Sequence, residues 1–494
     1  MRYLALDIGT TTIKGMVYDG EGKALSFAEG KTKSYSSEPD FMEKDAEESC
    51  KVILGVLRRL IQEVKKEKQT IGFISLSSYM HSLMAVDSDG EILSPLMMWN
   101  DGRSFKYALD YKHNGIGQKI YENTGTPIHA MTPLYKLMWI RDKEPEIFEK
   151  AHKFISMKEY LLYKMTNEFA IDHSMASATG IFNLKTLDWN ELALSEIGIK
   201  KDKLSIPCPT TTIFNSMTKK FQEAIGADVP IPIVIGATDG CLASLGSHGT
   251  KKNTGVVTIG TSGAVRVVTD TPLIDKEART FTYILDDGLY VSGGATNNGG
   301  IVYEWMKELV GVSDDLDLSL SKSQPGAKGL IFLPYITGER APYYNSKLRG
   351  SFFGLSIHHS KHDLMEAAIE GVSFALKEVY EILSSLVPEV DALYANGGFI
   401  KSEIWIKRLA SILKKKIIIS DQGDAALFGA YLLGLKAIGV INNYEESEPY
   451  FQGERVYEPE QSEVLDELFL IYQEAVSKNV LILEKLSSLQ DNRL

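Results

Sequence analysis

Two aspartates stand where carboxylates could take part in phosphoryl transfer. Asp7 lies near the end of an apolar run, residues 3–9, and Asp239 follows the apolar run 231–236 and opens a helix. Phosphoryl transfer needs Mg²⁺ to bridge phosphate oxygens and a carboxylate to accept the proton of the attacking hydroxyl. Asp7 could hold hydrated Mg²⁺ directly or through water, and Asp239 could act as the general base. The alternative role of Asp239 is that of a helix N-cap.

Two short turns rich in Gly, Thr and Ser could bind phosphate. The first contains Gly9, Thr10 and Thr11, and the second contains Gly260 and Thr261, followed by a serine and a glycine. Such turns expose backbone N–H groups, and their hydroxyls add further donors. Lys14 could add positive charge if the second strand folds back beside the first turn. The alternative for either turn alone is an ordinary β-hairpin.

The chain contains an internal repeat that includes both turns. Residues 7–19 align with residues 258–270 without a gap, and five of the thirteen positions are identical. A strand followed by a small-residue turn and a helix also recurs, at residues 231–240 and 392–399. We therefore expect two halves built on one plan, with a nucleotide cleft that uses both turns.

Polar groups that could grip a polyhydroxylated ligand gather in two other segments. Met80 and His81 follow a strand, and Asp101 and Arg103 follow a short hairpin. A single histidine at a strand end is more often structural than functional. The cluster as a whole nevertheless indicates an acceptor site.

The elements that must position these residues alternate between strands and helices. Residues 3–9, 12–18 and 72–76 read as strands, and residues 43–68 carry a helical stripe of apolar side chains. Residues 363–387 and 461–487 predict further amphipathic helices, the second of which either caps the second half or touches a partner. The apolar stretch 425–441 is short for a bilayer and includes a lysine, which favours a buried helix.

The composition and motif content of the chain disfavour several classes of partner and of nucleotide-binding fold. The chain has 494 residues and a formal net charge of −12, so nucleic acid and anionic membrane surfaces are poor candidate partners. Its three cysteines are far apart and show no metal-ligand spacing, which fits a reducing cytoplasm. The sequence has no GxxxxGK[ST] and no GxGxxG motif, which weakens the P-loop and Rossmann alternatives.

With these residues in place, the chain resembles the FGGY carbohydrate kinases of the actin-like ATPase superfamily almost from end to end. The resemblance rests on several motifs in the family's order: Asp7-Ile8-Gly9-Thr10-Thr11-Thr12-Ile13-Lys14, Met131-Thr132-Pro133-Leu134-Tyr135-Lys136-Leu137-Met138-Trp139, Gly236-Ala237-Thr238-Asp239-Gly240, Gly260-Thr261-Ser262-Gly263 and Asn396-Gly397-Gly398.

The resemblance implies an α/β fold of two ribonuclease-H-like domains with an interdomain cleft. Residues 1–247 would form the N-terminal domain, with the sugar site and the first phosphate hairpin, and residues 248–494 the C-terminal domain, with the second hairpin and the adenosine site. It further implies MgATP as cofactor and donor, Asp239 as general base and Asp7 as the Mg²⁺ residue. Adenosine would lie at Gly397, Gly398 and Ser402.

Within the family, several segments are most similar to gluconate kinases, which implies phosphorylation of D-gluconate at its 6-hydroxyl. Among them are Met80-His81-Ser82-Leu83-Met84 and Gly338-Glu339-Arg340-Ala341-Pro342. Trp99-Asn100-Asp101 is closer to xylulose kinases, so D-xylulose is the alternative acceptor. A different class, an actin-like ATPase without an acceptor, uses the same hairpins. The resemblance also suggests a homodimer.

Overall fold

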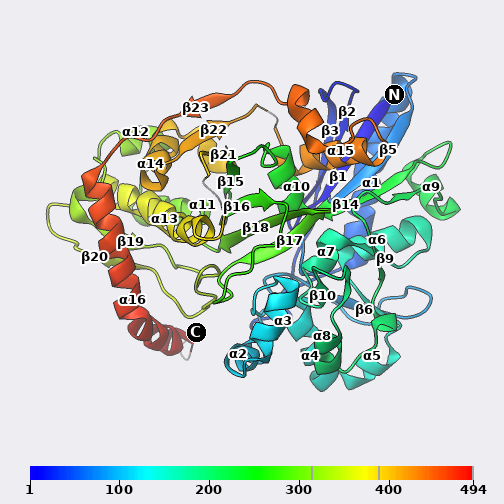
Figure 1. Cartoon of the computed structure of the whole chain (residues 1–494), viewed down its shortest axis with the longest axis horizontal. Helices are drawn as coiled ribbons and strands as arrows, with labels where there is room; N and C mark the ends of the chain where they lie inside the picture. The colour runs from blue at the N-terminus through cyan, green and yellow to red at the C-terminus, as the bar shows by residue number, and fades with distance from the viewer. Residues whose placement is uncertain (313–314, 388–389, 422, 492–494) are drawn as a thin grey trace. The chain divides into compact units, whose positions relative to one another are not determined.

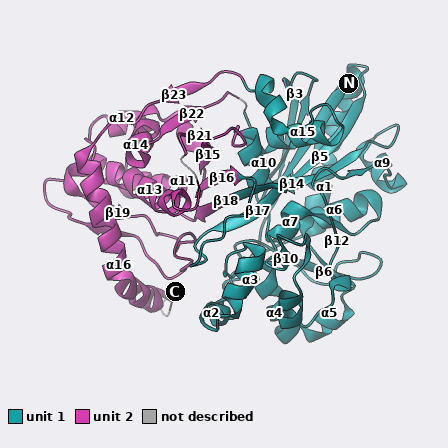
Figure 2. Ribbon diagram, in the orientation of Figure 1, with its two compact units in different colours: residues 1–246, 269–291, 422–451 teal, residues 247–268, 292–421, 452–494 magenta. Residues whose placement is uncertain are grey.

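The computed structural model describes residues 1–312, 315–387, 390–421 and 423–491, and divides the chain into two compact units (Figures 1 and 2). Unit 1 comprises residues 1–246, 269–291 and 422–451, and unit 2 comprises residues 247–268, 292–421 and 452–494. The expected domain division at residue 247 stays a prediction. Within the described ranges, no helix is both long and apolar enough to cross a membrane.

Unit 1 is built on a six-stranded mixed sheet with the order β13-β14-β5-β1-β2-β3. Strands β14, β5 and β1 run parallel, whereas β1, β2 and β3 form an antiparallel meander. The strand bounds are Arg2–Ile8 for β1, Thr12–Tyr18 for β2, Ala24–Lys31 for β3, Ile71–Ser78 for β5, Ile213–Phe214 for β13 and Ile233–Thr238 for β14.

Helix α1, Ala46–Lys66, covers part of this sheet and confirms the predicted helical stripe. The carboxylate of Asp45 accepts a hydrogen bond from the backbone N–H of Glu48 at 3.0 Å, which caps the start of the helix. The apolar side chains at Ile53, Val56 and Leu60 are buried in the core between helix and sheet. Each completely buried side chain of this kind stabilises the fold by about 1.5–3 kcal/mol.

A set of helices and short strands, which lie between β5 and β14 except for β4 ahead of α1, adds a second apolar core to unit 1. Its helices are α2 Phe105–His113, α3 Ile116–Thr124, α4 Pro133–Lys143, α5 Pro145–Lys150, α6 Met157–Thr166, α7 His173–Ser177, α8 Glu191–Ile197 and α9 Lys219–Ile225. Its short strands pair as β4 Glu43–Lys44 with β7 Leu96–Met97, β6 Met84–Val86 with β8 Lys153–Ile155, β9 Ala170–Asp172 with β12 Ile206–Cys208, and β10 Phe182–Asn183 with β11 Asp188–Trp189.

Two helices from distant parts of the sequence cross closely in unit 1. Helix α10, Asp239–Gly246, begins directly after β14, and α15, Ala425–Ala437, packs against α10, β1 and β5 (Figure 1). A Cβ atom at Gly429 would lie 1.9 Å from the carbonyl oxygen of Leu242, so only glycine permits this crossing. Helix α15 is the buried helix that the apolar stretch predicted.

Unit 2 repeats the strand plan of unit 1. Strand β15, Thr254–Ile259, pairs antiparallel with β16, Gly263–Thr269, and parallel with β21, Ala392–Asn396. In unit 1, β1 is likewise antiparallel to β2 and parallel to β5. The order continues with β22 Lys416–Ile419 and β23 Arg455–Tyr457. The recurrence of this arrangement confirms the internal repeat.

The helices of unit 2 include the two long ones that the sequence predicted. They are α11 Gly300–Leu309, α12 Leu316–Leu320, α13 Lys361–Ser384, α14 Glu403–Leu413 and α16 Glu463–Asp491. The remaining strands are β19 Ile331–Leu333 paired with β20 Ser351–Phe353, β17 Phe281–Asp286 in unit 1, and β18 Leu289–Thr296, which crosses the boundary of the two units along the chain. Buried side chains of α13, α14, α16 and β19 share one core.

Candidate active site

The first phosphate hairpin joins β1 to β2 in unit 1. Asp7 pairs with Lys14 and Ile8 with Ile13 across the two strands, so residues 9–12 form a tight turn. A Cβ atom at Gly9 would lie 2.4 Å from the carbonyl oxygen of Thr12, which explains the glycine. The turn is therefore tight, and its expected contact with phosphate stays a prediction.

Asp7 lies at the base of this turn in an electronegative setting. Its Oδ1 accepts a hydrogen bond from the Ser77 hydroxyl at 2.6 Å. Burial, together with the neighbouring carboxylates of Asp239 and Asp424, raises the pKa of Asp7 to about 7, whereas Ser77 and Lys14 oppose the shift. A cation placed among these three carboxylates would favour their ionised forms.

Two lysines contact the hairpin. The ammonium group of Lys14 lies 2.7 Å from Oδ2 of Asp424, the N-cap residue of α15. Lys44 is buried and donates to the carbonyl oxygen of Thr10 and to the hydroxyl of Thr32. Burial lowers the pKa of Lys44 to about 8. Lys44 therefore fixes the backbone of the turn, while Lys14 is held by a carboxylate.

Asp239 begins α10 directly after β14. Its Oδ1 accepts a hydrogen bond from the backbone N–H of Gly240 at 2.7 Å, while the hydroxyl of Thr238 accepts from the N–H of Cys241 at 3.4 Å and so takes the N-cap position. Asp239 lies close enough to Asp7 to influence the pKa of that residue, and its role as general base stays a prediction.

The expected acceptor residues Met80 and His81 lie in the turn that follows β5. His81 has a backbone φ of 67°, in the left-handed region that few residues other than glycine adopt. Its Nδ1–H donates to the carbonyl oxygen of Ala178 at 2.8 Å, and the Tyr283 hydroxyl lies 3.3 Å from Nε2. These contacts set the orientation of the imidazole ring, and Met80 beside it is half-buried.

Asp101 and Arg103 form a buried ion pair with each other. The guanidinium donates to both carboxylate oxygens of Asp101, at 2.8 and 2.7 Å, and to Glu43 at 2.6 Å. Only 4% of the Arg103 side chain is exposed, and it stacks on the ring of Phe41. Asp101 also accepts from the backbone N–H of Met42 at 2.7 Å. The pair therefore anchors the loop, and its expected role in binding substrate stays a prediction.

The second hairpin joins β15 to β16 in unit 2 and packs on the start of α11. The N–H of Gly300 donates to the carbonyl oxygen of Gly260 at 2.7 Å, and the N–H groups of Gly299 and Ile301 donate to that of Thr261. A Cβ atom at Gly299 would lie 2.5 Å from the backbone of Ser262, which explains the paired glycines at the start of this helix.

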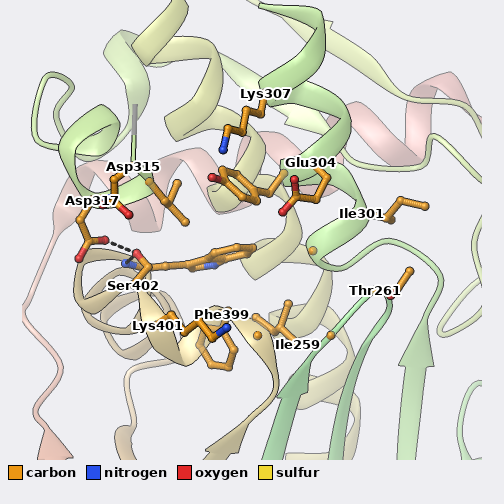
Figure 3. A pocket seen from close by; sticks show the side chains of 16 residues that line it. Ile259, Thr261, Ile301, Glu304, Lys307, Asp315, Asp317, Phe399, Lys401 and Ser402 are labelled. Atoms are coloured by element: carbon orange, nitrogen blue, oxygen red, sulfur yellow. Dashed lines mark hydrogen bonds between the residues drawn. The ribbon is translucent and has the colours of Figure 1, made fainter. Parts of the chain in front are cut away.

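A pocket of about 580 Å³ opens beside this hairpin, entirely within unit 2 (Figure 3). Glu304 and Lys307 of α11 lie across the pocket from Phe399 and Lys401 (Figure 3). The expected nucleotide residues Gly260, Thr261, Gly398 and Ser402 also line it. The structure therefore brings these residues together in a cavity of the size that a nucleoside requires.

Two expected adenosine residues have structural roles that the contacts explain. Gly397 has a φ of 102°, and a Cβ atom there would lie 2.4 Å from the carbonyl oxygen of Ile259. The hydroxyl of Ser402 donates to Asp317 and accepts from the N–H of Trp405 at 3.1 Å, which caps α14. Their nucleotide contacts stay predictions.

Sequence reasoning missed four residues near the first hairpin and the acceptor turn: Glu43, Lys44, Lys136 and Asp424. Lys136 stands inside the apolar run of α4, and Asp424 precedes the apolar run of α15. A charged residue inside or beside an apolar helix is the signal that could have indicated them, because buried charges need partners. Throughout residues 1–312, 315–387, 390–421 and 423–491, no group of three or more His, Cys, Asp or Glu side chains is arranged to hold a metal ion.

The chain matches two family models along most of its length. Residues 2–246 match the N-terminal domain, and residues 255–438 the C-terminal domain, of the FGGY family of carbohydrate kinases.

The individual relatives that the chain resembles are sugar and sugar-acid kinases as well. A gluconokinase from Bacillus subtilis (strain 168) is 38% identical over 456 residues, which cover 90% of this chain and 88% of that protein. The crystal structure of a ligand-bound xylulose kinase from Lactobacillus acidophilus superposes with a TM-score of 0.94 at 33% identity, over 98% of this chain and 99% of that one. A gluconate kinase from the same species gives a TM-score of 0.93 at 33% identity, over 97% and 98% of the two chains.

Proposed function

Because the chain belongs to the FGGY family of carbohydrate kinases, it is an ATP-dependent carbohydrate kinase, and we propose that its acceptor is D-gluconate, phosphorylated at the 6-hydroxyl. The two-domain α/β fold of the actin-like ATPase superfamily is confirmed by the same matches. Family membership also argues against an actin-like ATPase without an acceptor.

The acceptor assignment is supported by the 38% identity to a gluconokinase over 90% of the chain. The turn that carries Met80 and His81 is similar to those of gluconate kinases. D-Xylulose remains the second candidate, because the Trp99-Asn100-Asp101 segment and one of the two solved relatives favour it.

We propose that Asp239 is the general base. Its position beside Asp7, at the carboxyl end of a strand next to the first hairpin, is the observation that carries this assignment. Asp239 would accept the proton of the acceptor hydroxyl as that oxygen attacks the γ-phosphate of ATP. The hairpin N–H groups and Lys14 would stabilise the charge on the transferred phosphoryl group.

A magnesium ion fits the residues of unit 1 through water rather than by direct chelation. Burial and two further carboxylates raise the pKa of Asp7, and a divalent cation would favour its ionised form. The described residues nevertheless form no set of three direct metal ligands. Bound Mg²⁺ would supply charge neutralisation at the phosphate oxygens. Asp7 would hold its water shell, while Ser77 fixes the orientation of the carboxylate.

ATP would place its adenosine in the pocket of unit 2, with Gly398 and Ser402 in its wall, Gly397 next to Gly398 in the chain, and Gly260 and Thr261 beside the phosphates. Asp317 holds the Ser402 hydroxyl, so this serine would shape the pocket wall as the cap of α14. We also propose a cytoplasmic location, supported by the wide spacing of the three cysteines in the sequence, and keep a homodimer as a prediction.

The acceptor is tested by measuring ADP release from MgATP with D-gluconate, D-xylulose, L-ribulose, glycerol or no acceptor. We expect turnover with gluconate well above that with every other compound. Higher turnover with xylulose would replace the proposed acceptor, and equal, low ADP release under all conditions would contradict kinase activity on this group of acceptors.

The general base is tested by Asp239→Asn, which keeps a side-chain oxygen for the bond from the Gly240 N–H. We expect turnover to fall by about 10²- to 10⁴-fold with little change in ATP binding. Asp45→Asn, at the N-cap of α1, is the control for an aspartate at a helix start. Near-normal turnover in Asp239→Asn would remove this residue from its role.

A further inference from the structure

A buried lysine, Lys136, joins the two loops that carry the expected acceptor residues of unit 1. Its ammonium group donates to the carbonyl oxygen of His81 at 2.7 Å and to that of Met98 at 2.6 Å. His81 ends the turn after β5, and Met98 directly precedes the segment that contains Asp101 and Arg103. One side chain of α4 thus ties both loops together.

The surroundings of Lys136 explain why its ammonium must make these bonds. The residue is fully buried, and its partners in the described structure are backbone carbonyls. Burial, with a small contribution from Arg103, lowers the pKa of Lys136 to about 7, and the carboxylate of Asp101 opposes the shift. A charge this deeply buried is retained only where hydrogen bonds replace its water, so the two carbonyls and the lysine constrain one another.

The hydrogen bond from Lys136 to the His81 carbonyl supports an unfavourable backbone conformation at His81. Its φ of 67° is unfavourable for a residue with a Cβ atom and persists only where surrounding contacts enforce it. Lys136 bonds the carbonyl of this same residue, and the Ala178 carbonyl holds its ring at Nδ1. The backbone and the imidazole are therefore fixed separately, from two different elements.

Two other buried lysines of unit 1 act in the same manner on other loops. Lys44 donates to the carbonyl oxygen of Thr10 in the first hairpin, and Lys158 donates to that of Ala237 at 3.1 Å, just before Asp239. Each thus fixes the backbone of a segment with a proposed catalytic role. Lys158 also forms an ion pair with Asp172, whereas Lys136 bonds two carbonyls.

We infer that Lys136 is a positioning residue for the acceptor: it holds the His81 turn and the Met98–Arg103 loop in the arrangement that binds the sugar acid. The inference rests on the proposed acceptor site. It assigns no chemical step to Lys136, which acts through the backbone of the residues that would touch substrate.

The test compares Lys136→Met, which removes all donors at similar length, with the wild type and with Met138→Ala. Met138 is buried in the same helix, so its truncation reports on loss of stability alone. We expect Lys136→Met to raise the KM for the acceptor about tenfold or more, with the KM for ATP nearly unchanged. Met138→Ala should lower the melting temperature without this selective change.

A double-mutant cycle with His81→Ala separates positioning from general loosening. If Lys136 acts through His81, Lys136→Met should add little to the acceptor KM once the imidazole is gone. Additive effects, or equal changes in the KM for acceptor and for ATP, would overturn the inference. If Lys136→Met does not fold, Lys136→Leu, which also lacks hydrogen-bond donors, takes its place, and an acceptor KM like that of the wild type would overturn the inference.

The proposed acceptor is judged separately, on the wild-type enzyme. If the wild type prefers xylulose, the same KM comparison is made with xylulose, so that failure of the gluconate assignment and failure of the positioning role give different results.

Discussion

The ammonium group of Lys14 lies 2.7 Å from a carboxylate oxygen of Asp424, although 410 positions of sequence separate the two residues. Both side chains are partly exposed, and both lie in unit 1. The lysine expected to contact phosphate is therefore already paired with an anion. A phosphate group that approaches the first hairpin must compete with Asp424 for this charge.

This competition predicts the effect of Asp424→Asn, which keeps an oxygen to cap α15 but removes the negative charge. We expect a lower KM for ATP, by about two- to tenfold, because Lys14 becomes free to bind phosphate. Steady-state kinetics with varied MgATP measures it, with Asp228→Asn at an exposed ion pair as control. An increased requirement for Mg²⁺ would contradict the prediction and assign Asp424 to the metal.

Arg103 is predicted to contribute to stability. Arg103→Lys cannot reproduce the two-oxygen bond to Asp101 together with the bond to Glu43, so buried carboxylates lose donors. We expect the free energy of unfolding to fall by about 3 kcal/mol, measured by urea denaturation.

The exposed pair of Arg2 and Glu67 provides the control, and Arg2→Met should cost about 1 kcal/mol or less. If Arg103 instead binds the substrate carboxylate, Arg103→Lys will raise the KM for gluconate far more than the KM for an uncharged sugar, with little loss of stability.

Glu378 on α13 predicts a dependence of stability on pH. Burial, with a smaller contribution from the nearby Glu339, raises the pKa of this carboxyl to about 8, whereas the hydrogen bond from Tyr343 opposes the shift. The folded protein therefore holds a proton that the unfolded chain releases near its ordinary pKa. This stabilisation is complete below about pH 4.5 and is lost as the pH rises towards about 8.

Replacement of Glu378 by Gln removes the ionisation. We expect Glu378→Gln to be more stable than the wild type by about 2 kcal/mol at about pH 9, with little difference at about pH 4.5. Chemical denaturation of both proteins across this range provides the measurement. Parallel stability curves for the two proteins would contradict the raised pKa.

Gly429 is predicted to be essential for the crossing of α10 and α15. Because a Cβ atom would meet the Leu242 carbonyl at 1.9 Å, Gly429→Ala must push the helices apart, and we expect a loss of about 3 kcal/mol or more. Gly55, within α1, has no atom within 4 Å of the position that a Cβ atom would take, so Gly55→Ala should stabilise by about 0.5–1 kcal/mol. The melting temperatures of the two variants separate the effect of a steric clash on stability from the effect of helix propensity.

Local patterns were sufficient to predict much of the fold. The two hairpins, the stripe of α1 and the apolar α15 depend on neighbouring residues, and each appears at nearly the predicted position. The repeat of residues 7–19 at 258–270 predicted the shared strand plan, because equal spacing of glycines and apolar residues imposes equal turns.

The side-chain partners of the candidate site could not be predicted in this way. The residue type of Arg103 predicted contact with a ligand. Its guanidinium instead donates a hydrogen bond to Glu43, which lies 60 positions earlier. The pairing of Lys14 with Asp424 depends on the return of α15 to the first sheet, which no local pattern encodes. Such long-range partners are set by tertiary packing.

The division of unit 1 into three segments has a consequence for biosynthesis. Its first sheet is packed against α15, whose last residue is Ala437, so a ribosome must translate most of the sequence before this core can close. Domains that fold during synthesis usually do so in order from the N-terminus. Here the N-terminal sheet, although it precedes α15 by most of the sequence, keeps the face that α15 covers open to solvent until that helix has been translated.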